Sequence, residues 1–346
     1  MKNQTAYLVE SKKIELRESE MPVCGDEDVL VEIKHVGICG SDVMFFEDPT
    51  VGGVLDITLP IVLGHECAGV IVETGKNVKM LKKGDVVALE PGVPCGKCEY
   101  CLSGKYNLCP DVDFMAAPPF HRSALQKYVS HPAAFTFKLP ESMDTVQGAM
   151  IEPLAVGVHA ANRAQVQPGQ SICILGAGCI GLMTLMACKS RGATNITVVD
   201  LFQNRLDKAL ELGATKVINA RETDTIEELM RHTNNQGVDR VFETAGSVPT
   251  TQQIPYLVKA GGKAVIVGNV HGEPKMDFFA MNNKEADILS VFRYRNIFPM
   301  AIDSVASGSI PVKKVATNFF GFDQVQEAFE CALNEKQTAL KVVVQF

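Results

Sequence analysis

The sequence predicts an α/β protein with two domains, a β-rich domain and a domain built on a doubly wound parallel sheet. Three observations support this prediction. The chain of 346 residues is longer than one hydrophobic core usually organises. Before about residue 150, short apolar runs alternate with glycine-containing turns. From Ser171 onward, strand-like and helix-like segments alternate, which is typical of a parallel sheet with right-handed crossovers.

In the amino-terminal part of the chain, apolar runs bounded by turn residues indicate β-strands. We therefore expect an all-β lobe with long connections. A helix is expected to follow over residues 145–163, where apolar residues recur every three or four positions. The expected strands of the lobe lie in residues 29–42, 69–75 and 84–89.

The second half of the chain repeats one unit, a buried strand followed by a helix. This repetition predicts a parallel sheet with helices on its faces. The expected strands are 171–178, 195–200, 216–219, 238–246 and 260–268; the expected helices are 179–192, 202–213 and 226–233; and residues 339–346 are expected to form a terminal strand.

Composition and charge argue against several classes of protein. Hydrophobic residues make up 46% and charged residues 21%, as in globular enzymes. A net charge of −7 argues against a nucleic-acid partner, because phosphate binding needs a basic surface. The most apolar stretch, residues 172–188, is broken by glycines and is shorter than the roughly 20 residues that span a bilayer. With no signal peptide visible in MKNQTAYLVESKK, we expect a cytoplasmic protein with no membrane partner.

Four cysteines, Cys95, Cys98, Cys101 and Cys109, have the spacing C-x2-C-x2-C-x7-C. Thiolates this close on a short loop can surround one Zn²⁺ in a closed tetrahedral site. Disulfides suit small secreted proteins better than this chain. An iron–sulfur cluster also takes four thiolates, and spacing does not exclude it. A closed zinc site has no open coordination position, so it would brace the fold and take no part in catalysis.

Gly176, Gly178 and Gly181 form the pattern G-x-G-x-x-G between an apolar strand and a helix. In this context the pattern predicts a dinucleotide site, with the pyrophosphate at the helix amino terminus. Asp200 ends the next strand, about 20 residues on, where a carboxylate would bind the adenosine ribose and favour NAD over NADP. Arg205 would either stack on the adenine or lie exposed on its helix. The alternative for the glycines is a tight turn with no ligand.

Four further residues are candidates for a second metal site: Cys39, His65, Glu66 and Glu152. They lie in three separate segments, so only folding could bring them together. Each also has an ordinary explanation. A cysteine can be a small buried apolar residue, a lone histidine is more often a core residue than a ligand, and the two glutamates can pair with nearby bases.

The motifs G-x-C-G-S-D, GHE, the four-cysteine loop and G-x-G-x-x-G together resemble those of zinc-dependent medium-chain alcohol and polyol dehydrogenases. The resemblance covers almost the whole chain, and IEPLAVGVHA and VFRYRN are most similar to the sorbitol and xylitol dehydrogenase branch. It implies a GroES-like catalytic domain in residues 1–153 and 293–346 and a Rossmann NAD-binding domain in residues 154–292. It also implies a homo-oligomer, either a tetramer or a dimer.

The resemblance implies that Cys39, His65 and Glu66 ligate a catalytic zinc, with one position left open. Of the two glutamates, one is expected to bind directly and the other, Glu152 in polyol members, to reach the metal through water; direct binding by Glu152 and exchange between the two stay open as alternatives. One thiolate and one carboxylate neutralise Zn²⁺, so a second directly bound carboxylate would make the site a poorer Lewis acid. Ser41 would begin a proton relay, unless it is only a turn serine bonded to the backbone. Ile180, within the glycine motif, would contact the cofactor.

The substrate would be a sugar alcohol whose secondary hydroxyl is oxidised by NAD. By resemblance, Arg293 and Tyr294 would contact its hydroxyls, with Phe114 and Phe45 on the pocket wall. Polyol dehydrogenases usually have His and Tyr where this chain has Met44 and Phe45, which makes the rim more apolar.

Three alternatives to a polyol dehydrogenase remain. Arg122 and Arg295 are unusual basic residues that could clamp a phosphate, which would favour a phosphorylated sugar alcohol as substrate. A non-catalytic relative that binds NAD and zinc is the alternative of another class, although all four candidate ligands are present. A quinone reductase on the same scaffold would lack both metal motifs.

Overall fold

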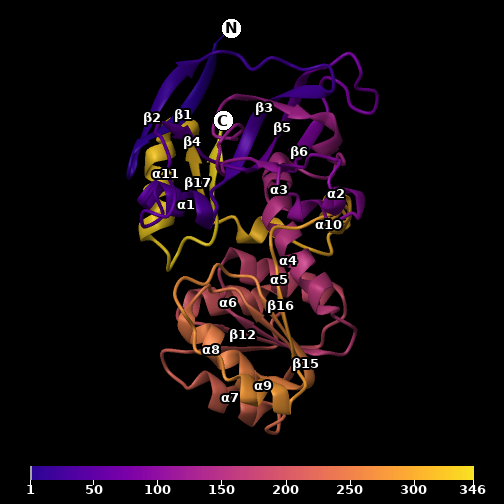
Figure 1. Cartoon of the computed structure of the whole chain (residues 1–346), viewed down its shortest axis with the longest axis vertical. Helices are drawn as coiled ribbons and strands as arrows, with labels where there is room; N and C mark the ends of the chain where they lie inside the picture. The colour runs from indigo at the N-terminus through magenta and orange to yellow at the C-terminus, as the bar shows by residue number, and fades with distance from the viewer. Residues whose placement is uncertain (1) are drawn as a thin grey trace. The chain divides into compact units, whose positions relative to one another are not determined.

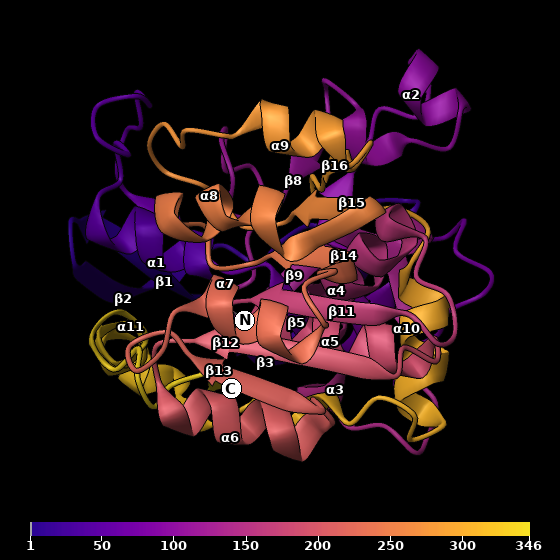
Figure 2. The ribbon, with the colours of Figure 1, turned by 90° about the horizontal axis from the view of Figure 1, so that it is seen from below.

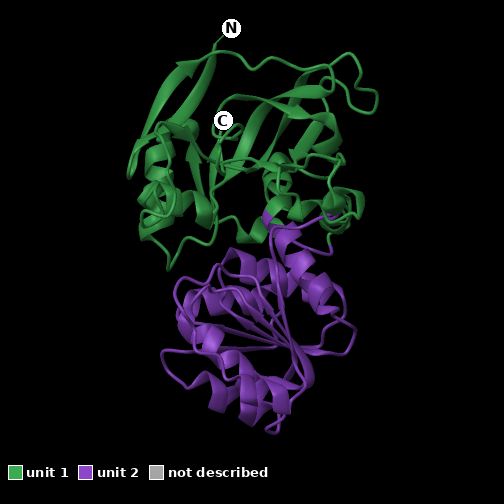
Figure 3. Cartoon of the chain, in the orientation of Figure 1, with its two compact units in different colours: residues 1–152, 298–308, 312–346 green, residues 153–297, 309–311 purple. Residues whose placement is uncertain are grey.

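A computed structural model describes residues 2–346 of the chain. They form two compact units (Figure 3). Unit 1 consists of Met1–Glu152, Phe298–Gly308 and Val312–Phe346, and unit 2 consists of Pro153–Ile297 and Ser309–Pro311. The boundaries expected from the sequence lay after residue 153 and before residue 293.

Unit 1 is organised by a seven-stranded sheet of order β10-β6-β5-β3-β18-β17, with β9 also paired to β3. Figure 1 labels β3, β5, β6 and β17 of this sheet. Its central strand β3 pairs antiparallel with β5, β9 and β18. Two small sheets, β2-β1-β4 and β7-β8, complete the unit. The strands are β1 Asn3–Glu10, β2 Lys13–Ser19, β3 Asp28–Gly37, β4 Ile61–Val62, β5 Glu66–Thr74, β6 Val86–Leu89, β7 Gly92–Val93, β8 Asp113–Phe114, β9 Tyr128–Pro132, β10 Thr136–Lys138, β17 Asn318–Gly321 and β18 Val342–Gln345.

The core of unit 1 lies between this sheet and the helices that cover it. Val31 and Ile33 of β3 are fully buried, as are Phe46 and Phe329, whose rings lie 5.0 Å apart. Each buried side chain of this size contributes about 1.5–3 kcal/mol relative to exposure. The helices are α1 Gly40–Glu47, α2 Glu99–Leu102, α3 Thr145–Ala149, α10 Phe298–Ala306 and α11 Val325–Asn334, with short 3-10 turns at Tyr106–Leu108, Ala133–Phe135, Val312–Val315 and Phe322–Gln324.

The prediction of an all-β lobe was wrong at α1, which follows β3 directly. The side chain of Asp42, in the first turn of α1, accepts the backbone N–H of Cys39 at 3.0 Å and so caps the helix. The single helix expected over residues 145–163 is divided at Met150 into α3 and α4 (Ile151–Ala164). Most of α4 belongs to unit 2.

Unit 2 contains a parallel sheet of order β13-β12-β11-β14-β15-β16, whose strands follow one another in this order in Figure 2. This confirms the predicted doubly wound α/β sheet, since β11 is buried and helices connect its neighbours. The strands are β11 Ser171–Leu175, β12 Asn195–Asp200, β13 Lys216–Asn219, β14 Val238–Glu243, β15 Val258–Ile266 and β16 Asp287–Ser290; the helices are α5 Cys179–Ser190, α6 Gln203–Leu212, α7 Thr225–His232, α8 Val248–Leu257 and α9 Phe278–Asn283. Within residues 2–346, no helix has the length and apolar character needed to cross a membrane.

Candidate active site and metal centres

Cys39, His65 and Glu66 come together at one end of the β3–β5 ladder. Each offers a ligand atom, and these atoms all lie within 4.8 Å of one another. The strand register explains the convergence, because Gly37 at the end of β3 lies opposite Glu66 at the start of β5. The residues just beyond this pair, Cys39 and His65, are therefore neighbours although 25 residues of chain separate them.

Asp42 holds the two segments in place. Its two carboxylate oxygens accept the backbone N–H groups of Cys39 at 3.0 Å and Gly64 at 2.9 Å. Oδ1 also lies 3.6 Å from Nδ1 of His65, which leaves the other ring nitrogen, Nε2, as the one available to a metal. Burial disfavours the charged forms of both Asp42 and His65, but the attraction between the two groups outweighs it. As a result, the pKa of Asp42 is lowered and the pKa of His65 is raised well above its usual value.

Glu66 is completely buried and uses one carboxylate oxygen for an ion pair. Oε1 accepts a hydrogen bond from Nζ of Lys341 at 2.6 Å, and the same ammonium donates to the carbonyl oxygen of Ile38 at 2.9 Å. Oε2 is buried without a hydrogen-bond partner. A buried carboxylate oxygen without a partner is costly, so Oε2 is suited to bind a cation together with the thiolate and the imidazole. This donor set fits a catalytic zinc.

Glu152, in the first turn of α4, is buried but does not belong to the group of three. Its charge acts on Glu90 and Cys67, which places it in the same neighbourhood. Glu90 is itself buried and accepts a hydrogen bond from the Tyr106 hydroxyl at 2.7 Å. Burial, together with the charge of Glu152, raises the pKa of Glu90 to about 7, against the effect of that hydrogen bond.

Among the other predicted residues of unit 1, Phe114 lies beside the metal-ligand candidate His65. Its ring centroid is 5.5 Å from that of His65. Phe45, in α1, is buried, and its ring packs edge-on at 5.3 Å against Phe120. Ser41 is half-buried in the first turn of α1. Phe114 thus provides an apolar wall beside the imidazole.

The four predicted cysteines of the loop also converge, with ligand atoms within 4.8 Å of one another. Sγ of Cys101 lies 3.4 Å from that of Cys98 and 3.9 Å from that of Cys95, and no cysteine of the described residues forms a disulfide. The backbone N–H groups of Lys97 and Cys98 lower the pKa of Cys95 to about 7, whereas desolvation raises that of Cys101 to about 12. Four such thiols need a cation to be ionised together, which Zn²⁺ would provide.

In unit 2 the glycine motif has the geometry of a phosphate-binding turn. Gly176 has a φ of +104°, which favours glycine, and a Cβ on Gly181 would lie 1.9 Å from the carbonyl oxygen of Gly176. A Cβ on Gly178 would meet only Nη1 of Arg205, at 3.7 Å, so space is left for a phosphate. Ile180 is half-buried in the first turn of α5, whose amino terminus faces this turn.

Asp200, at the end of β12, ties the next loop to this turn. Its oxygens accept the backbone N–H groups of Ala177 at 2.7 Å and Phe202 at 3.0 Å. The guanidinium of Arg205 lies 5.5 Å from the Phe202 ring, and that of Arg221 lies 4.4 Å from it. Arg205 is half-buried, so the exposed position considered from the sequence does not apply.

The predicted substrate residues of unit 2 lie in an irregular segment after β16. Arg293 is half-buried with a φ of +54°, and its guanidinium lies 4.7 Å from the Phe292 ring. Tyr294 is buried. A left-handed conformation costs a non-glycine residue on the order of 1–3 kcal/mol and is concentrated at functional sites. Of the two arginines considered for phosphate, Arg122 is paired with Asp113 at 2.8 Å.

Two residues that contact the candidate metal ligands were not expected from the sequence, Asp42 and Lys341. Asp42 lies in the quoted G-S-D motif, but only the fold shows its bonds to Cys39 and Gly64. The role of Lys341 had no local signal, because it lies 275 positions from Glu66.

The β-rich unit brings together a sulfur, a nitrogen and an oxygen ligand that suit zinc, and unit 2 carries a glycine turn on a parallel sheet that suits a dinucleotide. Together these two sites define a zinc- and dinucleotide-binding oxidoreductase. Comparison with known proteins agrees. Residues 25–141 match the alcohol dehydrogenase GroES-like domain, and residues 179–307 match the zinc-binding dehydrogenase family.

Individual relatives match along the whole chain. An uncharacterized zinc-type alcohol dehydrogenase-like protein of Escherichia coli K12, YdjJ, is 50% identical, covering 100% of this chain and 99% of its own. The sorbitol dehydrogenase of Bacillus subtilis is 41% identical, and the match covers 99% of this chain and 96% of that protein. The crystal structure of an Escherichia coli oxidoreductase of unknown specificity has a TM-score of 0.96 at 49% identity. The match covers 100% of this chain and 99% of that one. The chain therefore belongs to the zinc-binding alcohol dehydrogenases with a GroES-like domain, which confirms the predicted family and fold class.

Proposed function

We propose that the protein oxidises a secondary hydroxyl of a sugar alcohol to the corresponding ketose, using NAD and a catalytic zinc. The observation that carries the proposal is the convergence of Cys39, His65 and Glu66 around one potential ion site. Similarity to a sorbitol dehydrogenase along nearly the whole chain supports the polyol as substrate class. Arg293 and Tyr294 are the residues we propose to contact its hydroxyls.

Each residue of the metal group has a definable part in this chemistry. Bound zinc would supply Lewis acidity toward the substrate hydroxyl, and NAD would supply the hydride acceptor. Cys39, His65 and Glu66 would hold the ion, with Glu152 reaching it through water. Asp42 lies beside the imidazole at 3.6 Å, and Lys341 balances the charge of the Glu66 carboxylate.

The remaining proposed roles concern the proton, the pocket wall and the cofactor. Ser41 would pass the hydroxyl proton toward solvent, while the rings of Phe114 and Phe45 keep water from the reacting carbon. Gly176, Gly178, Ile180 and Gly181 would bind the pyrophosphate, and Asp200 and Arg205 the adenosine.

The four-cysteine loop would hold a second, structural zinc. We further propose a cytoplasmic homo-oligomer, tetramer or dimer. The 11 free cysteines support a reducing compartment.

The test is NADH absorbance when the purified protein, NAD and a panel of free and phosphorylated sugar alcohols are mixed, before and after treatment with a chelator. We expect NADH with a free polyol and its loss on chelation. A protein that binds NAD and zinc but reduces no NAD with any alcohol would favour the non-catalytic alternative. Preference for a phosphorylated polyol would shift the substrate class.

A further inference from the structure

The segment of residues 113–124 in unit 1 begins and ends beside His65. Near its start, the ring centroid of Phe114 lies 5.5 Å from that of the imidazole. At its end, the backbone N–H of Ala124 donates to the carbonyl oxygen of Gly64, the residue before His65, at 2.8 Å. The residues between these two contacts therefore form a loop whose two ends both lie at the candidate metal group.

Two contacts close this loop at its base. The guanidinium of Arg122 binds one carboxylate oxygen of Asp113, Oδ2, with Nε at 2.9 Å and Nη2 at 2.8 Å. The backbone N–H of Ala116 donates to the carbonyl oxygen of Arg122 at 2.8 Å. Ala116 and Phe120 have φ angles of +54° and +61°, a left-handed conformation that is uncommon outside glycine and is concentrated at functional sites. An ion pair and a backbone bond thus hold the loop in a defined shape.

Phe120, in the middle of the loop, meets the helix that begins at the metal-ligand candidate Cys39. Its ring packs edge-on against that of Phe45 in α1, with the ring centroids 5.3 Å apart, and Cys39 is the N-cap of the same helix. The backbone N–H of Phe120 donates to the carbonyl oxygen of Ala117 at 2.6 Å. Phe45 is buried and Phe120 is half-buried, so Phe120 is the member of this pair that a ligand can still reach.

The loop and the facing helix carry apolar side chains next to the metal group. Residues 114–120 read FMAAPPF and residues 43–46 of α1 read VMFF, and none of these side chains has a hydroxyl, amide or charged group. Of the polar side chains that follow, Arg122 is held in its ion pair, and the Ser123 hydroxyl donates to the carbonyl oxygen of Val62 at 2.6 Å. A substrate hydroxyl against this wall would find no side chain to replace its bonds to water, which is unfavourable, whereas a methyl group there would be stabilised by burial.

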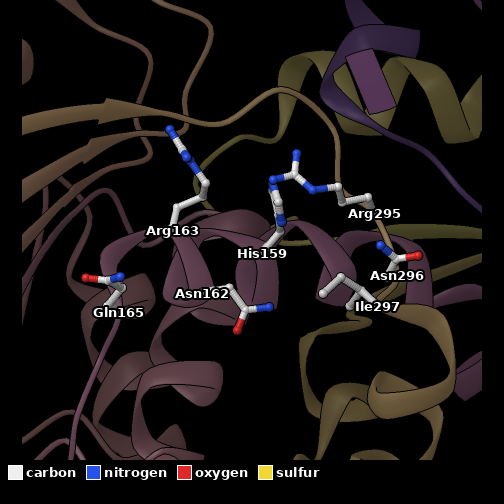
Figure 4. A pocket seen from close by; sticks show the side chains of 7 residues that line it. All are labelled: His159, Asn162, Arg163, Gln165, Arg295, Asn296 and Ile297. Atoms are coloured by element: carbon white, nitrogen blue, oxygen red, sulfur yellow. The ribbon is translucent and has the colours of Figure 1, made fainter. Parts of the chain in front are cut away.

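The pocket of unit 2 has the opposite character. It measures about 330 Å³ and lies between α4 and the segment that follows β16. The side chains that line it are labelled in Figure 4, and all of them are polar except that of Ile297. Hollows of this chain are therefore not apolar in general, and the lack of hydrogen-bonding side chains in residues 114–120 is particular to the wall beside the metal ligands.

We propose that Phe120 is a specificity residue of the substrate site and that, with Phe45, it receives a deoxygenated end of the substrate. The preferred substrate is then a diol or polyol that has a secondary hydroxyl for oxidation and a terminal methyl group in place of a terminal hydroxymethyl group. This inference rests on the proposed function, because it concerns the substrate of the same site. It goes further, since it states which hydroxyl the substrate lacks and which residue selects against it.

The experiment compares two pairs of alcohols as substrates of the zinc-loaded full-length protein with saturating NAD: galactitol with 1-deoxygalactitol, and erythritol with meso-butane-2,3-diol. The members of each pair differ only in terminal hydroxyl groups. We expect kcat/KM, measured from NADH absorbance, to be at least about tenfold higher for the deoxygenated member. The preference should lie mainly in KM, because a contact away from the reacting carbon acts on binding.

Substitutions at position 120 separate the chemistry of the wall from the shape of the loop. Phe120→Asn places an amide on the wall, and asparagine readily adopts a left-handed φ, so the backbone is preserved. This variant should lower the preference, which is the ratio of the two kcat/KM values within a pair, by at least about fivefold, whereas Phe120→Leu should keep it within about twofold. Phe319→Asn, at an exposed position of β17, is the control and should leave the preference unchanged. A ratio measured in one sample does not depend on the amount of active enzyme, so a partial loss of stability does not imitate the effect.

Two kinds of failure are distinguishable in this experiment. Wild-type protein that oxidises both members of each pair with equal kcat/KM, or that prefers the fully hydroxylated member, would overturn this inference and leave the proposed function standing. An unchanged preference in Phe120→Asn would do the same. Absence of NADH with every alcohol would reject the proposed function and this inference together.

Discussion

Nζ of Lys341 lies 2.6 Å from Oε1 of Glu66, and both side chains are buried. This ion pair joins the carboxyl-terminal strand region to the start of β5. It occupies one oxygen of Glu66 and leaves the other, Oε2, directed at no hydrogen-bond donor. The pair therefore both balances a buried charge and determines which oxygen a metal can use.

Replacing Lys341 tests this balance. In the metal-free protein, Lys341→Met would leave the Glu66 carboxylate buried without a counter-charge, which costs about 3–5 kcal/mol. We expect lower thermal stability, partly restored by zinc. The matched control is Lys76→Met, because the side chains of Lys76 and its partner Asp26 are 72% and 60% exposed. Loss of such a surface pair should change the stability by less than about 1 kcal/mol. Equal losses in the two variants would show that the buried pair has no special role.

Gly37 tests whether the carboxylate needs the space it occupies. A Cβ at position 37 would lie 2.2 Å from Oε2 of Glu66, so Gly37→Ala should displace this oxygen and cost about 1–3 kcal/mol by overpacking. We expect loss of one zinc per chain, measured by metal analysis, and loss of turnover. Gly40→Ala is the control, because a Cβ there meets nothing within 4 Å. Full zinc content in Gly37→Ala would mean that Oε2 is not a ligand.

The carboxylate of Asp200 is expected to set cofactor preference. Asp200→Ala removes the charge that would repel a 2′-phosphate, and it also frees the N–H groups of Ala177 and Phe202. We expect the ratio of kcat/KM for NAD over NADP to fall by about tenfold or more, which corresponds to roughly 1.4 kcal/mol. Asp207→Ala on the exposed face of α6 is the control. An unchanged ratio in Asp200→Ala would assign selectivity to another group.

The buried carboxyl of Glu90 predicts a pH dependence of stability. Its pKa in the folded protein is about 7, above the usual 4.5, so the folded state holds its proton more tightly than the unfolded state. Its contribution is then complete below about pH 4.5 and is lost as the pH rises through 7. We expect the melting temperature of wild type to fall more between pH 5 and pH 7.5 than that of Glu90→Gln. The extra fall should correspond to a loss of roughly a few kcal/mol in the free energy of unfolding. Parallel curves would refute the raised pKa.

The four-cysteine loop is predicted to act on stability and not on the reaction itself. Cys98→Ser should remove one zinc per chain and lower the melting temperature. Cys24→Ser, a half-buried cysteine outside both metal groups, should leave the zinc content unchanged. Two zinc ions retained in Cys98→Ser would contradict a four-thiolate site.

Local patterns were enough to predict the parallel sheet, the glycine turn and the cysteine loop. In each of these, the residues that act together are close in sequence. The strand 216–219 lies where the pattern placed it, whereas the strand expected over 171–178 ends at Leu175, where the glycine turn begins. The helix α1 was missed because its N-cap is Cys39, an unusual capping residue, and Asp42 in its first turn is indistinguishable from a turn residue in sequence. Its residues also follow directly on a strand.

The convergence of Cys39, His65 and Glu66 depends on the pairing register between β3 and β5. The amino-acid sequence of the two strands does not by itself specify this register. A shift of one residue would place Glu66 on the opposite face. The resemblance to a known family supplied the ligand set, but it gave no indication of Lys341 or of the space above Gly37. Both arise from contacts between strands that are distant in sequence.

The most direct test of the account is a crystal structure of the zinc-loaded protein. We predict a zinc ion bound by Sγ of Cys39 at about 2.3 Å, Nε2 of His65 at about 2.0–2.1 Å and Oε2 of Glu66 at about 2.0–2.2 Å, with a further position open or held by water. The Lys341–Glu66 pair should remain intact through Oε1. A zinc ion held without Glu66, or a closed site with four protein ligands, would contradict the account.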